Sequence, residues 1–199
     1  MPKHLKKLSE ESLHKNPWWE YKHDTYELPN GEAGDYYYAQ FSGMCITVPV
    51  LEDGRIVLCL QHRYLAGKQS IEFPGGGISD EGDITENARR ELYEESGCIA
   101  EEMLKVGTFE PANGYAKDTA HVFIARVAEI RSLPQTDASE EFEVLIRRPD
   151  EIDHMVKNNE IWSGETLAVW AMVRHHFFKE QEAQEVQSPL SHIFKLFEV

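Results

Sequence analysis

Residues 72–97 read E-F-P-G-G-G-I-S-D-E-G-D-I-T-E-N-A-R-R-E-L-Y-E-E-S-G, and this stretch decides the fold. Its first part is rich in glycine and predicts a loop. Its second part predicts a helix over residues 84–96, because Asp83 and Glu86 match an N-terminal capping box. Gly97 stands where a helix commonly ends, since glycine adopts the left-handed conformation without steric cost.

Three carboxylates crowd one side of the expected helix. At about 100° per residue, Glu91 and Glu95 lie one turn apart on the same face, and Glu94 lies beside them. Like charges at this spacing weaken an isolated helix, whereas a hard divalent cation such as Mg²⁺ turns the repulsion into binding. The preceding glycines let the backbone approach a metal or phosphate closely, so a carbonyl of Gly75 or Gly76 is a further candidate ligand. A solvated, charged helix face is the alternative interpretation.

The rest of the chain predicts one α+β domain with an added N-terminal hairpin. Residues 1–16 read as a loosely held start with room for one short helix, and residues 73–83 as a loop. The alternation within residues 44–50 predicts a half-buried strand, and the apolar run at 55–63 predicts a buried one. Further strands are expected over residues 18–28, 35–40, 103–110, 120–131 and 141–148, and helices near 150–158 and 164–179.

Length, charge and cysteine usage exclude several classes of protein. The 199 residues suit one domain, and a net charge of −15 disfavours a protein that binds long nucleic acids through a basic face. We expect no membrane attachment and a cytoplasmic location, because no apolar run approaches the roughly 20 residues of a transmembrane helix and the start lacks a signal peptide's apolar centre. Three separated cysteines without a C-x-x-C pair fit a reducing compartment.

The segment from Gly76 to Cys98 resembles the Nudix box, G-x5-E-x7-R-E-U-x-E-E-x-G-U, in which U is a bulky apolar residue. The box's first glutamate falls on Gly82, which is flanked by Glu81 and Asp83 as substitutes, and Cys98 fits the last apolar position weakly. The fixed positions that match are Gly76, Arg90, Glu91, Leu92, Glu94, Glu95 and Gly97.

This resemblance implies a Nudix-type α/β/α sandwich with a mixed sheet and a hydrolase that uses Mg²⁺, with Mn²⁺ as the alternative. It implies that Glu91 and Glu95 are catalytic, and that Arg90 orients the glutamates through ion pairs without touching substrate. Gly76 and Gly97 take structural positions. The metal ligands implied by the resemblance are Glu91, Glu94, Glu95 and the carbonyl of Gly75.

Features outside the box resemble the ADP-ribose pyrophosphatase branch of the family. These are Gln61-His62-Arg63, Ile71-Glu72-Phe73-Pro74 and the aromatic N-terminal hairpin. The resemblance implies that the hairpin builds a homodimer and that Arg63 and Glu72 lie at the substrate, with Arg63 holding a phosphate. An ordinary strand-end arginine is the alternative for Arg63.

Aromatic residues are the candidates for stacking on the nucleobase. By resemblance these are Trp18, Trp19 and Tyr21, with core or dimer packing as the equal alternative. The branch carries a proline in a loop after the box, and that position falls on Asn113 here, followed by Gly114 and Tyr115. We include Tyr115 among the substrate-binding candidates, and this departure leaves nucleotide sugars other than ADP-ribose open.

A general base is still needed, and the resemblance places it in an acidic loop before a late strand. The matching stretch is D-A-S-E-E-F-E at residues 137–143, where Glu140 is the first candidate and Glu141 the second. A merely solvated acidic loop is the alternative. The nine histidines form no metal pattern, and no serine or cysteine is set up as a nucleophile with an evident base.

The sequence therefore predicts a metal-dependent hydrolase that cleaves the diphosphate of a nucleoside-diphosphate sugar, such as ADP-ribose, into a nucleoside monophosphate and a sugar phosphate. Two alternatives are a non-catalytic nucleotide-binding Nudix domain and a house-cleaning nucleoside triphosphate hydrolase. The expected division is an N-terminal hairpin segment for dimerisation and base binding over residues 1–40, a Nudix domain over 41–180 and a tail over 181–199.

Overall fold

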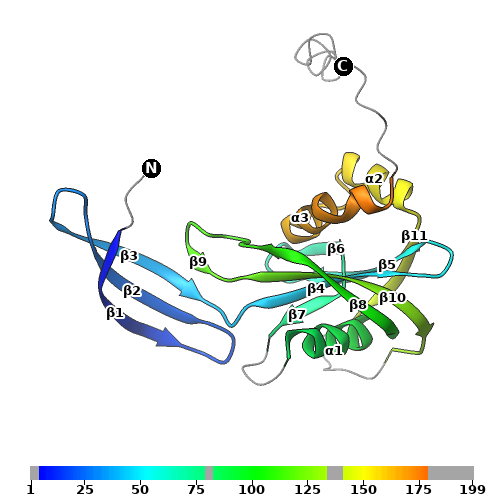
Figure 1. The fold of residues 1–199 in the computed structure, drawn as a ribbon, viewed down its shortest axis with the longest axis horizontal. Coiled ribbons are helices and arrows are strands. Elements are labelled where there is room, and N and C mark those ends of the chain that lie inside the picture. The colour runs from blue at the N-terminus through cyan, green and yellow to red at the C-terminus, as the bar shows by residue number, and fades with distance from the viewer. Residues whose placement is uncertain (1–4, 79–82, 134–140, 179–199) are drawn as a thin grey trace, which may run out of the picture.

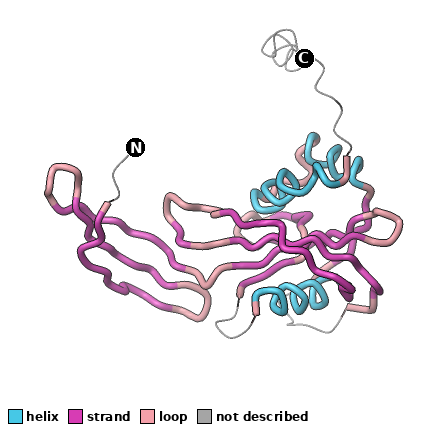
Figure 2. The backbone as a smooth tube through the Cα atoms, in the orientation of Figure 1, coloured by secondary structure: helices cyan, strands magenta, loops and turns pink. Residues whose placement is uncertain are grey.

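Two β-sheets meet end to end, and helices cover both faces of the larger one (Figures 1 and 2). The computed structural model describes residues 5–78, 83–133 and 141–178. In the larger sheet the strand order is β11-β5-β4-β10-β8, with β6 paired to β5 and β7 paired to β4. Its strands are β4 (Met44–Val50), β5 (Ile56–Arg63), β6 (Lys68–Glu72), β7 (Gly75–Gly77), β8 (Cys98–Phe109), β10 (Ala120–Ile130) and β11 (Glu143–Arg147).

The larger sheet is mixed and lies between two layers of helix. β4 and β10 pair in parallel, and the other neighbours pair antiparallel. α1 (Ile84–Ser96) lies on one face, and α2 (Pro149–Lys157) and α3 (Gly164–Val173) lie on the other (Figure 1). The predicted α/β/α sandwich with a mixed sheet is therefore confirmed.

Helix α1 spans the predicted residues because its end signals are local. The Asp83 side chain accepts a hydrogen bond from the Thr85 amide at 2.7 Å. Gly97 ends the helix with φ 68°, and its amide donates to the Tyr93 carbonyl at 2.8 Å. A side chain on Gly97 would collide with the Arg131 carbonyl, so a glycine is required there for space as well as for conformation.

Strand β4 is buried on both faces, so the expectation of a half-buried strand was wrong. Ile46 and Val48 pack in the cluster shared with α2 and α3. Cys45 packs with Ala88 of α1 on the opposite face, and Thr47 is 1% exposed. The alternation reflected small against large side chains rather than buried against exposed ones, because helices cover both sides of the sheet.

The smaller sheet contains the expected hairpin and two strands that were not expected. Its order is β1-β2-β3-β9, with β1 (Lys6–Lys15), β2 (Glu20–Glu27), β3 (Ala33–Gln40) and β9 (Ala116–Lys117). β2 and β3 confirm the two predicted hairpin strands. The short helix considered for residues 1–16 was wrong, because that segment is β1, a fully exposed strand held by its ladder with β2.

Three other boundaries differ from expectation. The glycine-rich segment is not all loop, since β7 pairs with β4 in register Gly76↔Cys45. β8 starts at Cys98, five residues before the predicted strand, because it continues directly from the end of α1. The last helix ends at Val173 and continues as a 3-10 turn over Arg174–His176. Cys45, Cys59 and Cys98 are free and buried, as their use as apolar residues predicted.

No helix among the described residues combines the length and apolar character needed to cross a membrane. The division at residues 40 and 180 stays a prediction. β9 belongs to a later part of the chain, yet it completes the N-terminal sheet. Residues 181–199 lie outside the described residues.

Candidate active site

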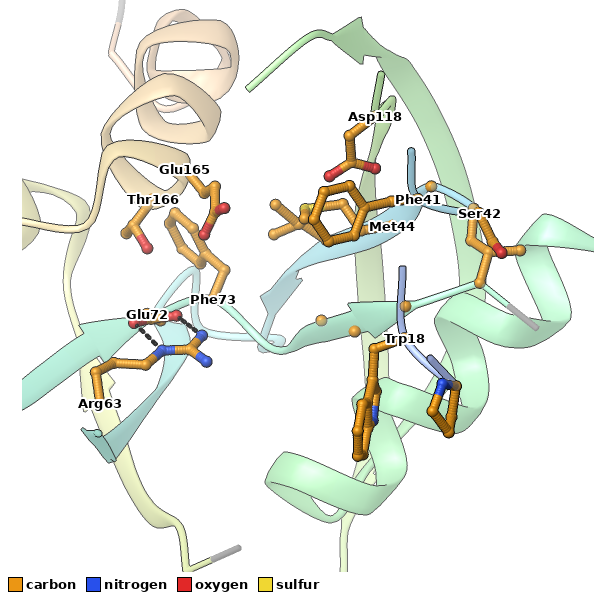
Figure 3. A pocket seen from close by; sticks show the side chains of 17 residues that line it. Trp18, Phe41, Ser42, Met44, Arg63, Glu72, Phe73, Asp118, Glu165 and Thr166 are labelled. Carbon is orange, nitrogen blue, oxygen red and sulfur yellow. Dashed lines mark hydrogen bonds and ion pairs between the residues drawn. The ribbon is translucent and has the colours of Figure 1, made fainter. Parts of the chain in front are cut away.

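A cavity of about 640 Å³ opens where the two sheets meet, beside β7 and α3 (Figure 3). Residues from six segments far apart in the sequence form its wall. Lining residues are Pro17, Trp18, Phe41, Ser42, Gly43, Met44, Ile46, Arg63, Glu72, Phe73, Gly75, Gly76, Gly77, Ile78, Asp118, Glu165 and Thr166.

The glycines of β7 allow α1 to bring its carboxylates against the backbone. The Gly75 amide donates to the Glu95 carboxylate at 2.8 Å, and Glu95 is 9% exposed. A Cβ placed on Gly76 would lie 2.5 Å from a carboxylate oxygen of Glu91. Any larger residue at position 76 would displace Glu91, so the backbone here forms a cradle shaped for this side chain.

Arg90 holds two of the three box carboxylates. Its guanidinium donates to Glu91 at 2.6 Å and to Glu94 at 2.7 Å. These ion pairs offset the repulsion that the spacing of the glutamates creates. Within residues 5–78, 83–133 and 141–178, no three acidic, histidine or cysteine side chains are gathered into a metal-binding group.

The donor chemistry nevertheless fits a hard divalent cation. Glu91, Glu94 and Glu95 supply carboxylate oxygens, and β7 supplies backbone carbonyls beside them. In the present arrangement these carboxylates turn towards Arg90 and the Gly75 amide. The positive charge of Arg90 therefore neutralises part of the negative charge of these glutamates, as a bound cation would.

Arg63 of β5 and Glu72 of β6 form a two-pronged ion pair on the cavity wall (Figure 3). The Arg63 Nε donates to Glu72 at 2.8 Å, and a terminal nitrogen donates to its second oxygen. Burial raises the pKa of Glu72, but the two bonds from Arg63 outweigh burial and hold that pKa below its ordinary value. Glu72 uses two of the five N–H donors of Arg63, and the remaining donors are available to an anionic ligand.

The aromatic candidates are only partly brought together. Trp18 lines the cavity and is 77% exposed. Trp19 lies off the cavity wall, with its ring 6.2 Å from that of His14. Tyr115 is 71% exposed and lines a separate hollow of about 280 Å³ with Tyr36.

Tyr21 and Glu141 also lie away from the cavity wall. The Tyr21 ring is 6.2 Å from that of Tyr37 on the N-terminal sheet. Glu141 is exposed and does not line the cavity. Glu140 lies outside the described residues, as do Glu81 and Gly82. The identity of the base therefore stays a prediction.

Sequence reasoning missed two carboxylates that point into the cavity, Asp118 and Glu165 (Figure 3). Asp118 precedes β10, and Glu165 lies in the first turn of α3. An acidic residue in the first turn of a helix is ordinarily explained by its favourable interaction with the helix dipole, so Glu165 did not stand out as a site residue. No sequence signal identified Asp118, because its place at the cavity depends on the pairing of β10 with β4, which only the structure shows.

A second hollow of about 490 Å³ adjoins the cavity on the side of α3. Its wall includes Trp162 and Phe109, and it shares three charged residues with the cavity. The shared residues are Arg63, Glu72 and Glu165. The two hollows together suit a ligand made of two parts joined near Arg63.

A family model and several known proteins are similar to this chain. The model of a family described as the NUDIX domain matches residues 43–169. The ADP-ribose pyrophosphatase of Bacillus subtilis (strain 168) is 27% identical over 141 residues, which cover 70% of this chain and 76% of that protein. The CMP-5'-(N-acetyl-N-hydroxy-3-aminopropyl)phosphonate hydrolase of Streptomyces rubellomurinus (strain ATCC 31215) is 27% identical over 148 residues, covering 74% of this chain and 71% of that protein.

A solved structure supports the fold alone. The crystal structure of an ADP compounds hydrolase superposes with a TM-score of 0.74 at 16% identity. The superposition covers 87% of this chain and 94% of the other. The coverage reaches well beyond the segment that the family model matches.

Proposed function

The chain belongs to the Nudix family, and from that premise we propose that it is a divalent-metal-dependent hydrolase of nucleoside-diphosphate sugars. The reaction splits the diphosphate linkage and gives a nucleoside monophosphate and a sugar phosphate. The observation that carries the proposal is the contact between α1 and β7, which sets Glu91 and Glu95 against the glycine backbone beside a large cavity. The similarity to an ADP-ribose pyrophosphatase favours ADP-ribose among the candidate substrates.

The box residues hold the cation in this proposal. Glu91, Glu94 and Glu95, with the Gly75 carbonyl, are its ligands, and these oxygen donors suit Mg²⁺, with Mn²⁺ as the alternative. When bound, such a cation supplies charge neutralisation at the diphosphate and a more acidic water. Arg90 keeps the carboxylates oriented through the two ion pairs described above.

The remaining steps fall to residues around the cavity. Arg63 donates to the phosphate oxygens with the N–H groups that Glu72 does not use. Glu140 or Glu141 takes the proton of the attacking water. The water oxygen bonds to one phosphorus, and the other phosphate leaves as the bridging P–O bond breaks. Trp18 stacks on the nucleobase at the cavity mouth.

The proposal also covers the oligomeric state and the cellular location of the protein. The chain forms a homodimer through its N-terminal sheet, which exposes Tyr36, Tyr37 and other aromatic residues. It works in the cytoplasm, where three buried thiols stay reduced. Of the alternatives, a non-catalytic nucleotide-binding domain is supported only by Gly82 at the first glutamate position of the box, and the intact Arg90-Glu91 and Glu94-Glu95 pairs disfavour it.

A phosphate-release screen tests the proposed function. The purified protein is incubated with Mg²⁺ or Mn²⁺ and ADP-ribose, other nucleotide sugars, dinucleotides and nucleoside triphosphates. A phosphatase converts monophosphate products to free phosphate, and the triphosphate reactions are assayed for pyrophosphate. Turnover of a nucleotide sugar well above the rest is expected. Faster turnover of triphosphates, or none of any compound, contradicts the proposal.

A further inference from the structure

Two carboxylates in the cavity have no role in the hydrolysis described above. Asp118 and Glu165 come from opposite sides of the cavity, one from the segment before β10 and the other from α3 (Figure 3). Neither belongs to the box, and neither forms an ion pair with a cation among the residues that the structure describes. Two carboxylates in a cavity for an anionic substrate need an explanation, because they repel the negative charge of that substrate.

Asp118 is buried without a full set of hydrogen bonds. It is 8% exposed, and its Oδ1 atom has no hydrogen-bond partner in the described part of the chain. Burial raises the pKa of Asp118, the charge of Glu110 raises it further, and a bond from the Thr119 amide opposes both. A buried acceptor without a donor costs free energy, so Asp118 is prepared to accept from a ligand.

Glu165 provides a second acceptor across the cavity. Burial raises the pKa of Glu165, and the nearby charge of Glu72 raises it further. Arg63 does not offset this fully, because its two-pronged bond goes to Glu72. Glu165 lies where the cavity and the adjoining hollow meet, across the cavity from Asp118 (Figure 3).

Apolar side chains separate the two carboxylates. Phe41 and Met44 lie beside Asp118, and Phe73 lies below Glu165 (Figure 3). Acceptors around an apolar floor match a sugar ring, which presents C–H groups on its face and hydroxyl donors at its rim. The same arrangement repels a phosphate, because like charges in a partly buried site are costly to bring together.

We propose that Asp118 and Glu165 form a hydroxyl clamp, which accepts hydrogen bonds from a sugar ring of the substrate and rejects an additional phosphate in its place. The clamp makes the two residues determinants of specificity for nucleoside-diphosphate sugars over nucleoside triphosphates. This inference rests on the proposed function. The ring is either the terminal sugar or the ribose of the nucleoside, and analogues that lack one or the other tell them apart.

The test compares wild type with Asp118→Asn and Glu165→Gln, which keep the shape of each side chain and remove its charge. Glu102→Gln, an exposed site on β8, is the matched control. The kcat/KM for ADP-ribose should fall about 10-fold in each clamp variant, mainly through KM, because the charge-assisted bond from the hydroxyl is replaced by a weaker bond to a neutral amide oxygen. The kcat/KM for ATP should stay level or rise, so the preference for the sugar shrinks.

Two analogues identify the ring. One is ADP-ribose built on 2′-deoxyadenosine, and the other is the β-methyl ester of ADP, which lacks the terminal sugar. Wild type should discriminate against one of them, and the clamp variants should lose that discrimination. A sugar-to-triphosphate preference in both variants equal to that of wild type overturns the clamp.

Two further controls separate failure of the clamp from misfolding of a variant and from failure of the proposed function. Glu165 lies at the start of a helix, so Glu165→Gln keeps the test open if Asp118→Asn does not fold. If wild type hydrolyses nothing, the proposed function fails, but calorimetric titration of ADP-ribose in EDTA still tests the clamp. Weaker binding by about 10-fold or more in the variants supports it, and equal binding overturns it.

Discussion

Glu95 is the residue with the clearest predicted effect on rate. Its carboxylate is buried beside the Gly75 amide, and Glu95→Gln removes the charge with little change of shape. We expect kcat at saturating Mg²⁺ to fall on the order of 10²-fold or more, as when a key electrostatic group is lost. Glu101→Gln, an exposed carboxylate paired with Arg126, is the control. Steady-state activity within a few-fold of wild type would remove Glu95 from the metal site.

Asp118 should also make stability depend on pH. Its pKa is raised in the folded state by burial first and Glu110 second, so the folded protein binds its proton more tightly than the unfolded chain. The ionised form is therefore a cost at neutral pH, and this cost is relieved as the pH falls through the raised pKa.

Urea unfolding of wild type and Asp118→Asn at several values of pH checks this. The variant should be at least as stable as wild type at pH 7, and its relative advantage should shrink towards the ordinary range of aspartate, about pH 4. Comparing the two proteins cancels the titration of the other carboxyl groups. A difference in unfolding free energy that stays constant across the range would contradict the prediction.

The residues that sequence alone could identify are those whose chemistry is local. Glu91, Glu94 and Glu95 lie within two turns of one helix, so their spacing fixes their shared face before any tertiary contact forms. Asp118 and Glu165 are 47 positions apart, and only the packing of the sheet against α3 brings both to the same cavity. No periodicity relates them, and their burial comes from tertiary packing.

At the scale of elements, the packing of β7 on α1 gives a sharp prediction. Gly76→Ala places a methyl group against the flexible end of Glu91, which can turn aside. The melting temperature should change little, while activity should fall by roughly 10-fold or more because the carboxylate leaves its cradle. Gly114→Ala is the control, since a Cβ at that exposed position meets no atom within 4 Å. Equal activities of the two variants would show that the cradle is unimportant.

Elements were predictable where their signals lie within them. Helix α1 matches because Asp83 and Gly97 mark its ends directly. β1 escaped prediction because its residues are all exposed and carry no apolar alternation. It depends on pairing with β2 and on ion pairs such as Lys7 with Asp24. The burial of β4 was also predicted wrongly. Helices from distant parts of the chain decide whether one face of a strand is covered or both.

For the whole molecule, the proposed homodimer is the feature to measure. Sedimentation at micromolar concentration should give twice the 22.9 kDa mass of the chain. Tyr37→Arg, on the face of the N-terminal sheet where Tyr21 and His23 also lie, should shift the protein towards the monomer. A monomer mass for wild type would remove the dimer from the proposed function.

The two parallel pairings, β3 with β9 and β4 with β10, follow one another along the same two lengths of chain. Residues 39–50 and 116–126 thus run side by side from the smaller sheet into the larger one (Figure 1). Phe41 and Asp118 lie between the two paired stretches, and both line the cavity. We therefore expect that a change in the angle between the two sheets, such as contact with another molecule on the N-terminal sheet could cause, would change the shape of the cavity.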